Sequence, residues 1–185
     1  MKTLLERRRA IAEFQQTKYT RLKRTGESYV QTKNWAVRNI TRCLDELSKS
    51  VMNDQNAQLI RDEIDEYLKR YHDYCIKDQI GAHYREVGAL KKDCDFEHVI
   101  PKKVAREMMI YKIMTIDEAL NIPTCWLRKD KHQALNKMYA STTPDVWDFW
   151  ARYRNAFPDI AIQTWDGKNI DVSTWDIANH YEYFK

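Results

Sequence analysis

The chain contains few of the residues that interrupt regular backbone structure. Only four glycines and four prolines occur among its 185 residues. A fold built from many short strands needs turn residues every few positions, so their scarcity favours helices. The apolar fraction of 43% and the charged fraction of 31% are typical of a folded globular protein. We therefore expect an α+β fold that is mainly α.

Helical periodicity is clearest in the first 80 residues. Residues 28–51 carry apolar side chains at steps of mostly three and four positions, which is typical of an amphipathic helix. Residues 3–24 also have a helical pattern, and Asn53-Asp54 can cap a third helix that runs to about residue 80. The pattern predicts a helical N-terminal lobe over residues 1–90.

Positive charge is concentrated at the start of the chain. Residues 1–24 hold eight lysines and arginines against two glutamates, whereas the whole chain has a net charge of +4. A basic segment on a nearly neutral body is typical of a protein with a polyanionic partner. The alternative is the solvated face of a helix. On the first interpretation, Arg7, Arg8 and Arg9 contact nucleic acid.

After residue 91 the expected elements are shorter and alternate in type. Strands are expected at 96–100 and 124–127, and a hairpin turn at Asp166-Gly167. Helices are expected at 102–114, 116–120, 130–138 and 144–157, the third of them capped by Asp130, and a final helix is expected to be capped by Ser173. Residues 91–185 form the second expected domain, with helices and a hairpin in its C-terminal part.

One short segment of this second domain carries the residues that metal-assisted hydrolysis needs. Cleavage of a phosphodiester requires a base for the water, a cation for the developing charge and a fixed phosphate. Asp95 and Glu97 share one face of a strand, whereas His98 points to the other face. Glu97 and His98 can therefore serve one site only if the strand ends or twists there. His132, near the start of a helix, can complete a site of carboxylate and imidazole groups.

The string Glu97-His98-Val99-Ile100-Pro101 resembles the first strand of the HNH endonucleases, also known as His-Me finger or ββα-metal nucleases. In that family a loop with an asparagine, a second strand and a helix with a metal ligand follow. Asn121, 23 residues after His98, and His132, 34 residues after it, match those positions. The match covers residues 93–137, and the zinc-binding cysteines of one subgroup of the family are absent.

The resemblance implies a role for each matching residue. His98 would be the base that deprotonates the attacking water, and Asn121 would tie the loop across the finger and orient His98. The implied ligands of a divalent ion, Mg²⁺ or Mn²⁺, are Glu97 and His132, with Asp95 and Asn136 as additional or alternative ligands. The implied phosphate contacts are Arg128, Lys129 and Lys131.

These features predict an endonuclease that hydrolyses DNA, in which the ion stabilises the leaving 3′-oxyanion. Two alternatives remain: a non-catalytic nucleic-acid-binding or interaction protein with a degenerate finger, and a ribonuclease with the same finger. The small size resembles that of bacteriophage nucleases, which act in the host cytoplasm. Neither an apolar run of membrane-spanning length nor a secretory signal occurs, so we expect a cytoplasmic protein with no membrane partner. The sequence does not indicate the oligomeric state.

Several of these residues also have a purely structural interpretation. His98 can be a buried histidine paired with Glu97, and His132 a surface residue of its helix. His72 and His83 match no motif and are interpreted as structural. Because no secretory signal occurs, we expect free thiols at Cys43, Cys75, Cys94 and Cys125, and the lack of a CxxC pair argues against a structural zinc ribbon. We expect core positions, rather than stacking on bases, for most of Trp147, Trp150, Trp165 and Trp175.

Overall fold

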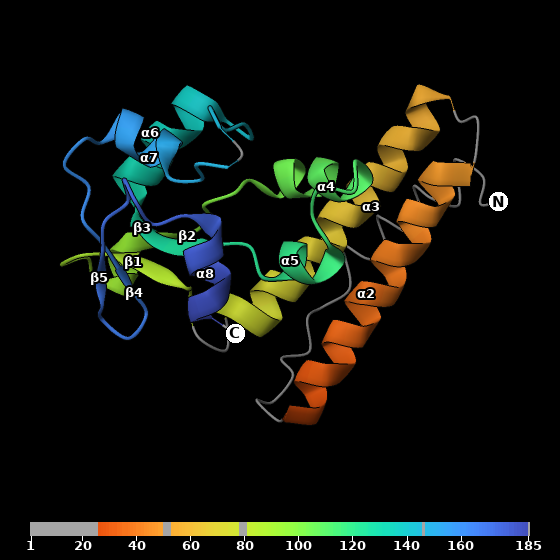
Figure 1. The fold of residues 1–185 in the computed structure, drawn as a ribbon, viewed down its shortest axis with the longest axis horizontal. Helices are drawn as coiled ribbons and strands as arrows, with labels where there is room; N and C mark the ends of the chain where they lie inside the picture. Colours follow the sequence, from red (N-terminus) through yellow and green to blue (C-terminus); the bar gives the residue numbers. More distant parts are fainter. Residues whose placement is uncertain (1–25, 50–52, 78–80, 146, 185) are drawn as a thin grey trace.

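The computed structural model describes residues 26–49, 53–77, 81–145 and 147–184. The predicted helix at 3–24, with Arg7, Arg8 and Arg9, lies outside these ranges. Over the described residues the fold is α+β and mainly α, as expected, with five strands in one mixed sheet. Figure 1 shows a helical hairpin on one side of the molecule and the sheet with its own helices on the other.

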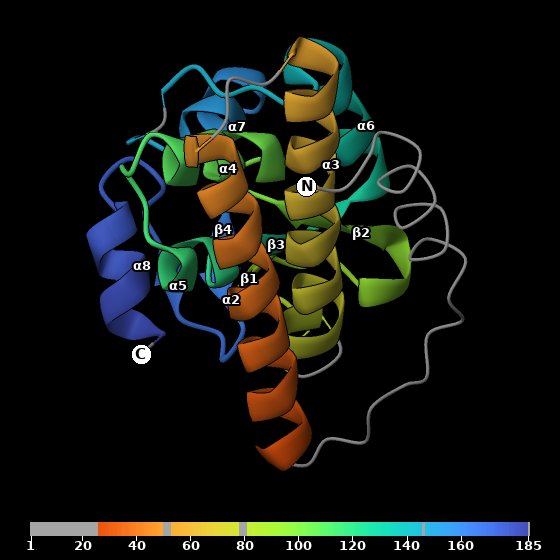
Figure 2. The ribbon, with the colours of Figure 1, turned by 90° about the vertical axis from the view of Figure 1, so that its right-hand side faces the viewer.

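The hairpin consists of α2 (Gly26–Lys49) and α3 (Asp54–Tyr71), which lie side by side and run in opposite directions (Figures 1 and 2). Asn53 caps α3 by accepting a hydrogen bond from the backbone N–H of Asn56 at 2.9 Å, as the sequence predicts. The apolar stripes of the two helices, Ile40 among them, are buried. Removal of these side chains from water is the main force that holds the pair together.

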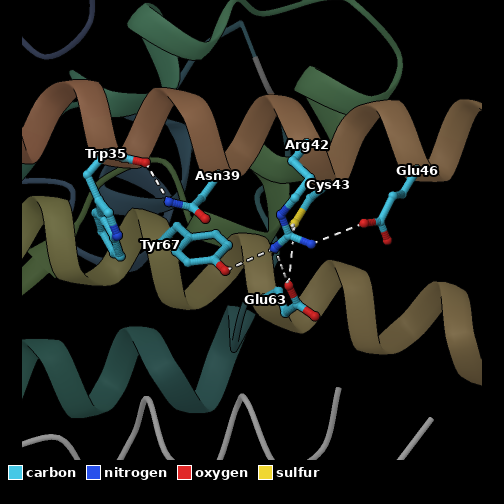
Figure 3. Close-up of polar contacts among 7 residues, drawn as sticks. All are labelled: Trp35, Asn39, Arg42, Cys43, Glu46, Glu63 and Tyr67. Atoms are coloured by element: carbon cyan, nitrogen blue, oxygen red, sulfur yellow. Dashed lines mark hydrogen bonds and ion pairs between the residues drawn. The ribbon is translucent and has the colours of Figure 1, made fainter. Parts of the chain in front are cut away.

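A polar cluster crosses the interface between α2 and α3 (Figure 3). Arg42 of α2 donates to the carboxylate of Glu63 of α3 at 2.8 Å and to the Tyr67 hydroxyl at 3.2 Å. The Cys43 thiol donates to the same carboxylate at 3.6 Å. Burial and the nearby carboxylate raise the pKa of Cys43 to about 12. The thiol therefore stays protonated, and the cluster aligns two helices rather than presenting a nucleophile.

Beyond Tyr71 the third helix changes character. Residues His72–Lys77 form a π-helix, η1, and the regular helix expected as far as residue 80 is therefore shorter than predicted. π-Helical turns are frequent at functional sites. Here η1 brings His72 against His98 and places the Lys77 ammonium 5.7 Å from the centre of the Phe96 ring.

The sheet is formed by β1 (Tyr84–Glu86), β2 (Cys94–His98), β3 (Thr124–Arg128), β4 (Ile162–Thr164) and β5 (Asn169–Ile170). Its strand order is β2-β3-β1-β4-β5, with β1 parallel to β3 and the other neighbouring pairs antiparallel. The sequence predicts every strand except β1. Because β1 lies before residue 91 and in the middle of the sheet, the predicted division at residue 90 separates one strand from the other four.

The remaining helices link and cover the sheet. A 3₁₀ turn, η2 (Lys91–Asp93), leads into β2. Helices α4 (Lys102–Ile110) and α5 (Ile116–Leu120) lie between β2 and β3 in the chain and pack on α3, so they join the hairpin to the sheet (Figure 1). Helix α6 (Lys129–Tyr139) follows β3 and contacts both β2 and β3. Helices α7 (Ala151–Ala156) and α8 (Ile177–Tyr183) cover the same face of the sheet as α6 does.

Three predicted helix starts are wrong. The helix expected from Pro144 begins only at Ala151, because the residues before it form turns. Helix α6 begins at Lys129, one residue before its predicted cap. Helix α8 is capped by Asp176, whose carboxylate accepts a backbone hydrogen bond from the first turn at 2.8 Å, and not by Ser173.

The cysteines and tryptophans differ in how deeply they are buried. All four cysteines are buried and free, as predicted. Trp150 is fully buried, whereas Trp147 and Trp165 are 60% and 52% exposed, so a core position is wrong for these two. Among the described residues, no helix is both long enough and apolar enough to cross a membrane.

Candidate functional site

Strand β2, at the edge of the sheet, presents different residues on its two faces. On the face covered by α6, Asp95 and Glu97 both contact His132. On the opposite face, the ring centres of Phe96 and His98 lie 5.3 Å apart. The predicted ligands Asp95, Glu97 and His132 are thus brought together, whereas the His98 imidazole lies on the other side of the strand.

The imidazole of His132 lies between the two carboxylates. Its Nδ1 is 3.1 Å from Asp95 Oδ2, and its Nε2 is 2.9 Å from Glu97 Oε2. Asn136, one helical turn further along α6, places its side-chain amide 3.2 Å from the same Nε2. The other three predicted metal ligands therefore meet around the His132 ring. Glu97 and Asn136 lie at its Nε2, whereas Asp95 lies at its Nδ1.

The contacts at Nε2 compete with one another. A protonated Nε2 can donate to Glu97 but then opposes an N–H of Asn136, whereas an unprotonated Nε2 can accept from Asn136 but opposes the carboxylate. The oxygen and nitrogen of an asparagine amide are assigned from such contacts, so the amide can also be turned over. In that orientation the amide oxygen of Asn136, together with the Glu97 carboxylate oxygen, lies beside Nε2 of His132.

Asp95 has a separate effect on the ring. If Nδ1 carries the proton, it donates to Asp95 and leaves the lone pair on Nε2, where Glu97 and Asn136 lie. A carboxylate on the far nitrogen is the usual means of fixing the tautomer of a metal-binding histidine. Within the residues described, no group of three or more His, Cys, Asp and Glu side chains is arranged to hold a metal ion.

Arg152 on α7 holds the other oxygen of Glu97. Its Nη2 donates to Glu97 Oε1 and, at 2.7 Å, to the backbone carbonyl of His98. The side chain is 1% exposed, and its Nε has no hydrogen-bond partner among the residues that the structure describes. Burial lowers the pKa of this guanidinium from its ordinary value. The sequence gives no signal for Arg152, because it lies 55 residues after Glu97 and outside every motif.

His98 forms a pair with His72 of η1. The Nε2 of His98 is 2.9 Å from Nδ1 of His72, and Nε2 of His72 is 3.2 Å from the Ala119 carbonyl oxygen. A carbonyl can only accept, so His72 Nε2 carries a proton, His72 Nδ1 accepts, and His98 Nε2 donates. Burial lowers the pKa of His72 to about 3 and the pKa of His98 well below its ordinary value. Both rings are therefore neutral at pH 7, and the His98 lone pair is on Nδ1.

Asn121, the residue expected to orient His98, lies elsewhere. It follows α5, where its side-chain amide donates to the Asp117 carbonyl at 2.8 Å. Its backbone carbonyl accepts from His180 Nε2 at 2.7 Å. The side chain thus closes the end of a helix, and the ring nitrogen of His98 is held by His72 instead. His72 was interpreted from the sequence as structural, because no local motif links residues 26 positions apart.

The predicted phosphate-binding cations lie at the junction of β3 and α6. Arg128 pairs with Glu86 of β1, and Lys131 contacts the same carboxylate at 2.7 Å. Although burial favours protonation of Glu86, hydrogen bonds from these two cations hold its pKa below the ordinary value. Lys129 donates to the Lys92 carbonyl at 3.0 Å. Two of the three cations therefore neutralise a buried glutamate.

No protein-family model, no curated protein and no solved structure matches this chain significantly.

Proposed function

We propose that the chain is a metal-dependent endonuclease that hydrolyses DNA, with Glu97, His132 and Asn136 as ligands of Mg²⁺ or Mn²⁺. The observation that carries the proposal is the convergence of Glu97 and Asn136 on the Nε2 of His132. Carboxylate and amide oxygens with one imidazole suit such ions. A cation there would also remove the competition at Nε2, because all three donor atoms could face it.

The order of elements supports the same proposal. Strands β2 and β3 form an antiparallel pair, and α6 follows β3 directly and contacts both strands. The HNH family, which the sequence resembles, has the same order of strand, strand and helix. Residues 99–123 form the segment between the two strands. Bound to these ligands, a divalent ion would stabilise the negative charge that develops on the leaving oxygen.

His98 is proposed as the base that accepts the proton of the attacking water. Its Nδ1 is unprotonated at pH 7 and can therefore accept a proton, and His72 holds the ring by the other nitrogen. Glu97 and His98 lie on opposite faces of β2, but β2 is the edge strand and His98 is its last residue. A phosphate that lies across this edge can be approached from both faces.

A second candidate is a nucleic-acid-binding protein without catalysis. It is favoured by one observation: Arg152 and His132 each contact one oxygen of Glu97, so this carboxylate has partners without a metal ion. In that case the cluster is a structural ion-pair network that joins β2, α6 and α7.

The two candidates are separated by a cleavage assay. Supercoiled plasmid and single-stranded DNA are each incubated with the wild-type protein, Glu97→Gln, His98→Ala and the control Asp130→Asn, an exposed carboxylate on α6, in Mg²⁺, Mn²⁺ or EDTA. We expect metal-dependent cleavage that falls at least about 100-fold in Glu97→Gln and His98→Ala and is unchanged in the control.

Each other outcome has a defined meaning. Cleavage retained by His98→Ala but lost in Glu97→Gln removes the proposed base and keeps the proposed ion. Cleavage of an RNA substrate alone identifies a ribonuclease. Wild-type protein that cuts neither DNA nor RNA with either ion supports the binding protein.

A further inference from the structure

The face of the sheet opposite α6 carries one continuous row of side chains. Strand pairing places five residues in register across all five strands, namely Phe96, Trp126, Arg85, Gln163 and Asn169. Because neighbouring strands are about 4.8 Å apart, the row spans roughly 19 Å. Two aromatic rings, a guanidinium and two amides thus follow one another along a line.

This row faces solvent, unlike the residues next to it. Arg85 and Asn169 are exposed, and Phe96, Trp126 and Gln163 are partly exposed. The residues that alternate with them on the strands, such as Tyr84, Cys125 and Ile162, are buried against the helices. Phe96 also packs against the edge of the core, whereas Trp126 does not belong to the core cluster.

Cations lie directly over the two rings. The Lys91 ammonium is 4.9 Å from the centre of the Trp126 ring, and the Lys77 ammonium is 5.7 Å from that of Phe96. Beside Trp126 is a hollow of about 200 Å³ whose walls include Arg85, Lys91 and the exposed Trp165. Of the described residues that line this hollow, two, Arg85 and Lys91, are cations and none is a carboxylate.

We propose that this row and hollow bind single-stranded DNA. Unpaired bases stack on aromatic side chains, phosphates pair with the cations beside them, and side-chain amides hydrogen-bond to the edges of bases. All three groups occur here on one open face. Duplex DNA does not fit the same chemistry, because its bases are already stacked on one another. The inference rests on the proposed nuclease function for calling this DNA a substrate, but the binding itself requires no cleavage.

Binding is measured by fluorescence anisotropy of a labelled oligothymidine of about 12 nucleotides in EDTA, which prevents cleavage. We expect wild-type protein to prefer this strand over a duplex of equal length. Trp126→Leu should weaken binding by about tenfold or more through lost stacking and leave the salt dependence unchanged. Arg85→Gln should weaken binding and reduce the slope of log K against log salt by about 0.7.

Matched controls are available at exposed positions away from this face. Trp147→Leu and Arg38→Gln change the same residue types, on the segment before α7 and on α2, and should bind as the wild type does. Equal losses in these controls, a preference for the duplex, or binding of RNA alone would overturn the proposal. Glu97→Gln should bind normally, so a failure of catalysis is distinguishable from a failure of this binding face.

Discussion

The imidazoles of His72 and His98 share one hydrogen bond, with Nδ1 of His72 and Nε2 of His98 2.9 Å apart, although the residues come from η1 and β2. Because His72 also donates to the Ala119 carbonyl, the direction of the chain of hydrogen bonds is fixed. We expect ¹⁵N NMR at pH 7 to show both rings neutral, with the proton on Nε2.

In His72→Phe, His98 loses its acceptor and the Ala119 carbonyl loses its donor. The His98 ring should then show a mixture of tautomers, and the free energy of unfolding should fall by about 1–3 kcal/mol for each group left unpartnered. His83→Phe removes another buried histidine and serves as the control. An unchanged His98 spectrum in His72→Phe would show that the pair does not fix the tautomer.

The ligand set predicts how metal affinity responds to substitution. Mn²⁺ should raise the melting temperature of the wild-type protein, because an ion that binds only the folded state stabilises it. Asn136→Ala and Glu97→Gln remove ligands and should abolish the increase. Asp95→Asn only weakens the hold on the far nitrogen of His132, so affinity should fall by about 10- to 100-fold. Titration calorimetry measures the affinities. If Asp95→Asn abolishes binding as completely as Glu97→Gln, Asp95 is itself a ligand.

The polar cluster between α2 and α3 predicts an unequal effect of two glutamates (Figure 3). Glu63→Ala removes a buried acceptor from both Arg42 and the Cys43 thiol, and should cost about 2 kcal/mol of unfolding free energy. Glu46→Ala removes a half-exposed partner of Arg42 one turn along the same helix, and should cost at most about 0.5 kcal/mol. Urea unfolding of both variants tests this order, and equal losses would contradict it.

His180 predicts a loss of stability in mild acid. Burial lowers its pKa to about 4, although its hydrogen bond to the Asn121 carbonyl acts in the opposite direction. Between pH 6.5 and about 4, the unfolded chain binds a proton that the folded chain excludes. The free energy of unfolding is therefore at its full value above pH 6.5 as far as His180 is concerned. It declines as the pH falls, by about 2 kcal/mol at pH 5. The difference in unfolding free energy between pH 7 and pH 5 should shrink by that amount in His180→Gln. An unchanged difference would mean that His180 titrates normally.

Much of the local structure follows from sequence patterns. Helices α2 and α3 have clear periodicity, short apolar segments predict strands near β2 and β3, and Asp166-Gly167 marks the hairpin of β4 and β5. Strand β1 has only three residues, too few for any alternation to be recognised. It exists because β3 and β4 provide hydrogen bonds on both of its sides, which is a property of the folded sheet.

In the candidate site, too, sequence patterns predict some contacts and not others. Spacing along one strand and one helix predicts that Asp95 and Glu97, as well as His132 and Asn136, share faces, and these residues do meet. Spacing does not reveal Arg152 or His72, because their contacts depend on how α7 and η1 pack against β2. Long-range packing, rather than any local motif, decides which side chains complete the site.

The position of β1 determines where the protein can be divided. A fragment that starts at residue 91 keeps every proposed metal ligand but lacks the central strand, so β3 and β4 would each expose an unpaired edge. Unpaired edges of this kind promote aggregation. The fragment also lacks α2, α3 and η1, on which α4, α5 and His98 pack. Only a second fragment that carries these helices together with β1 should restore the fold, so the chain is suited to fragment complementation rather than to excision of an independent catalytic module.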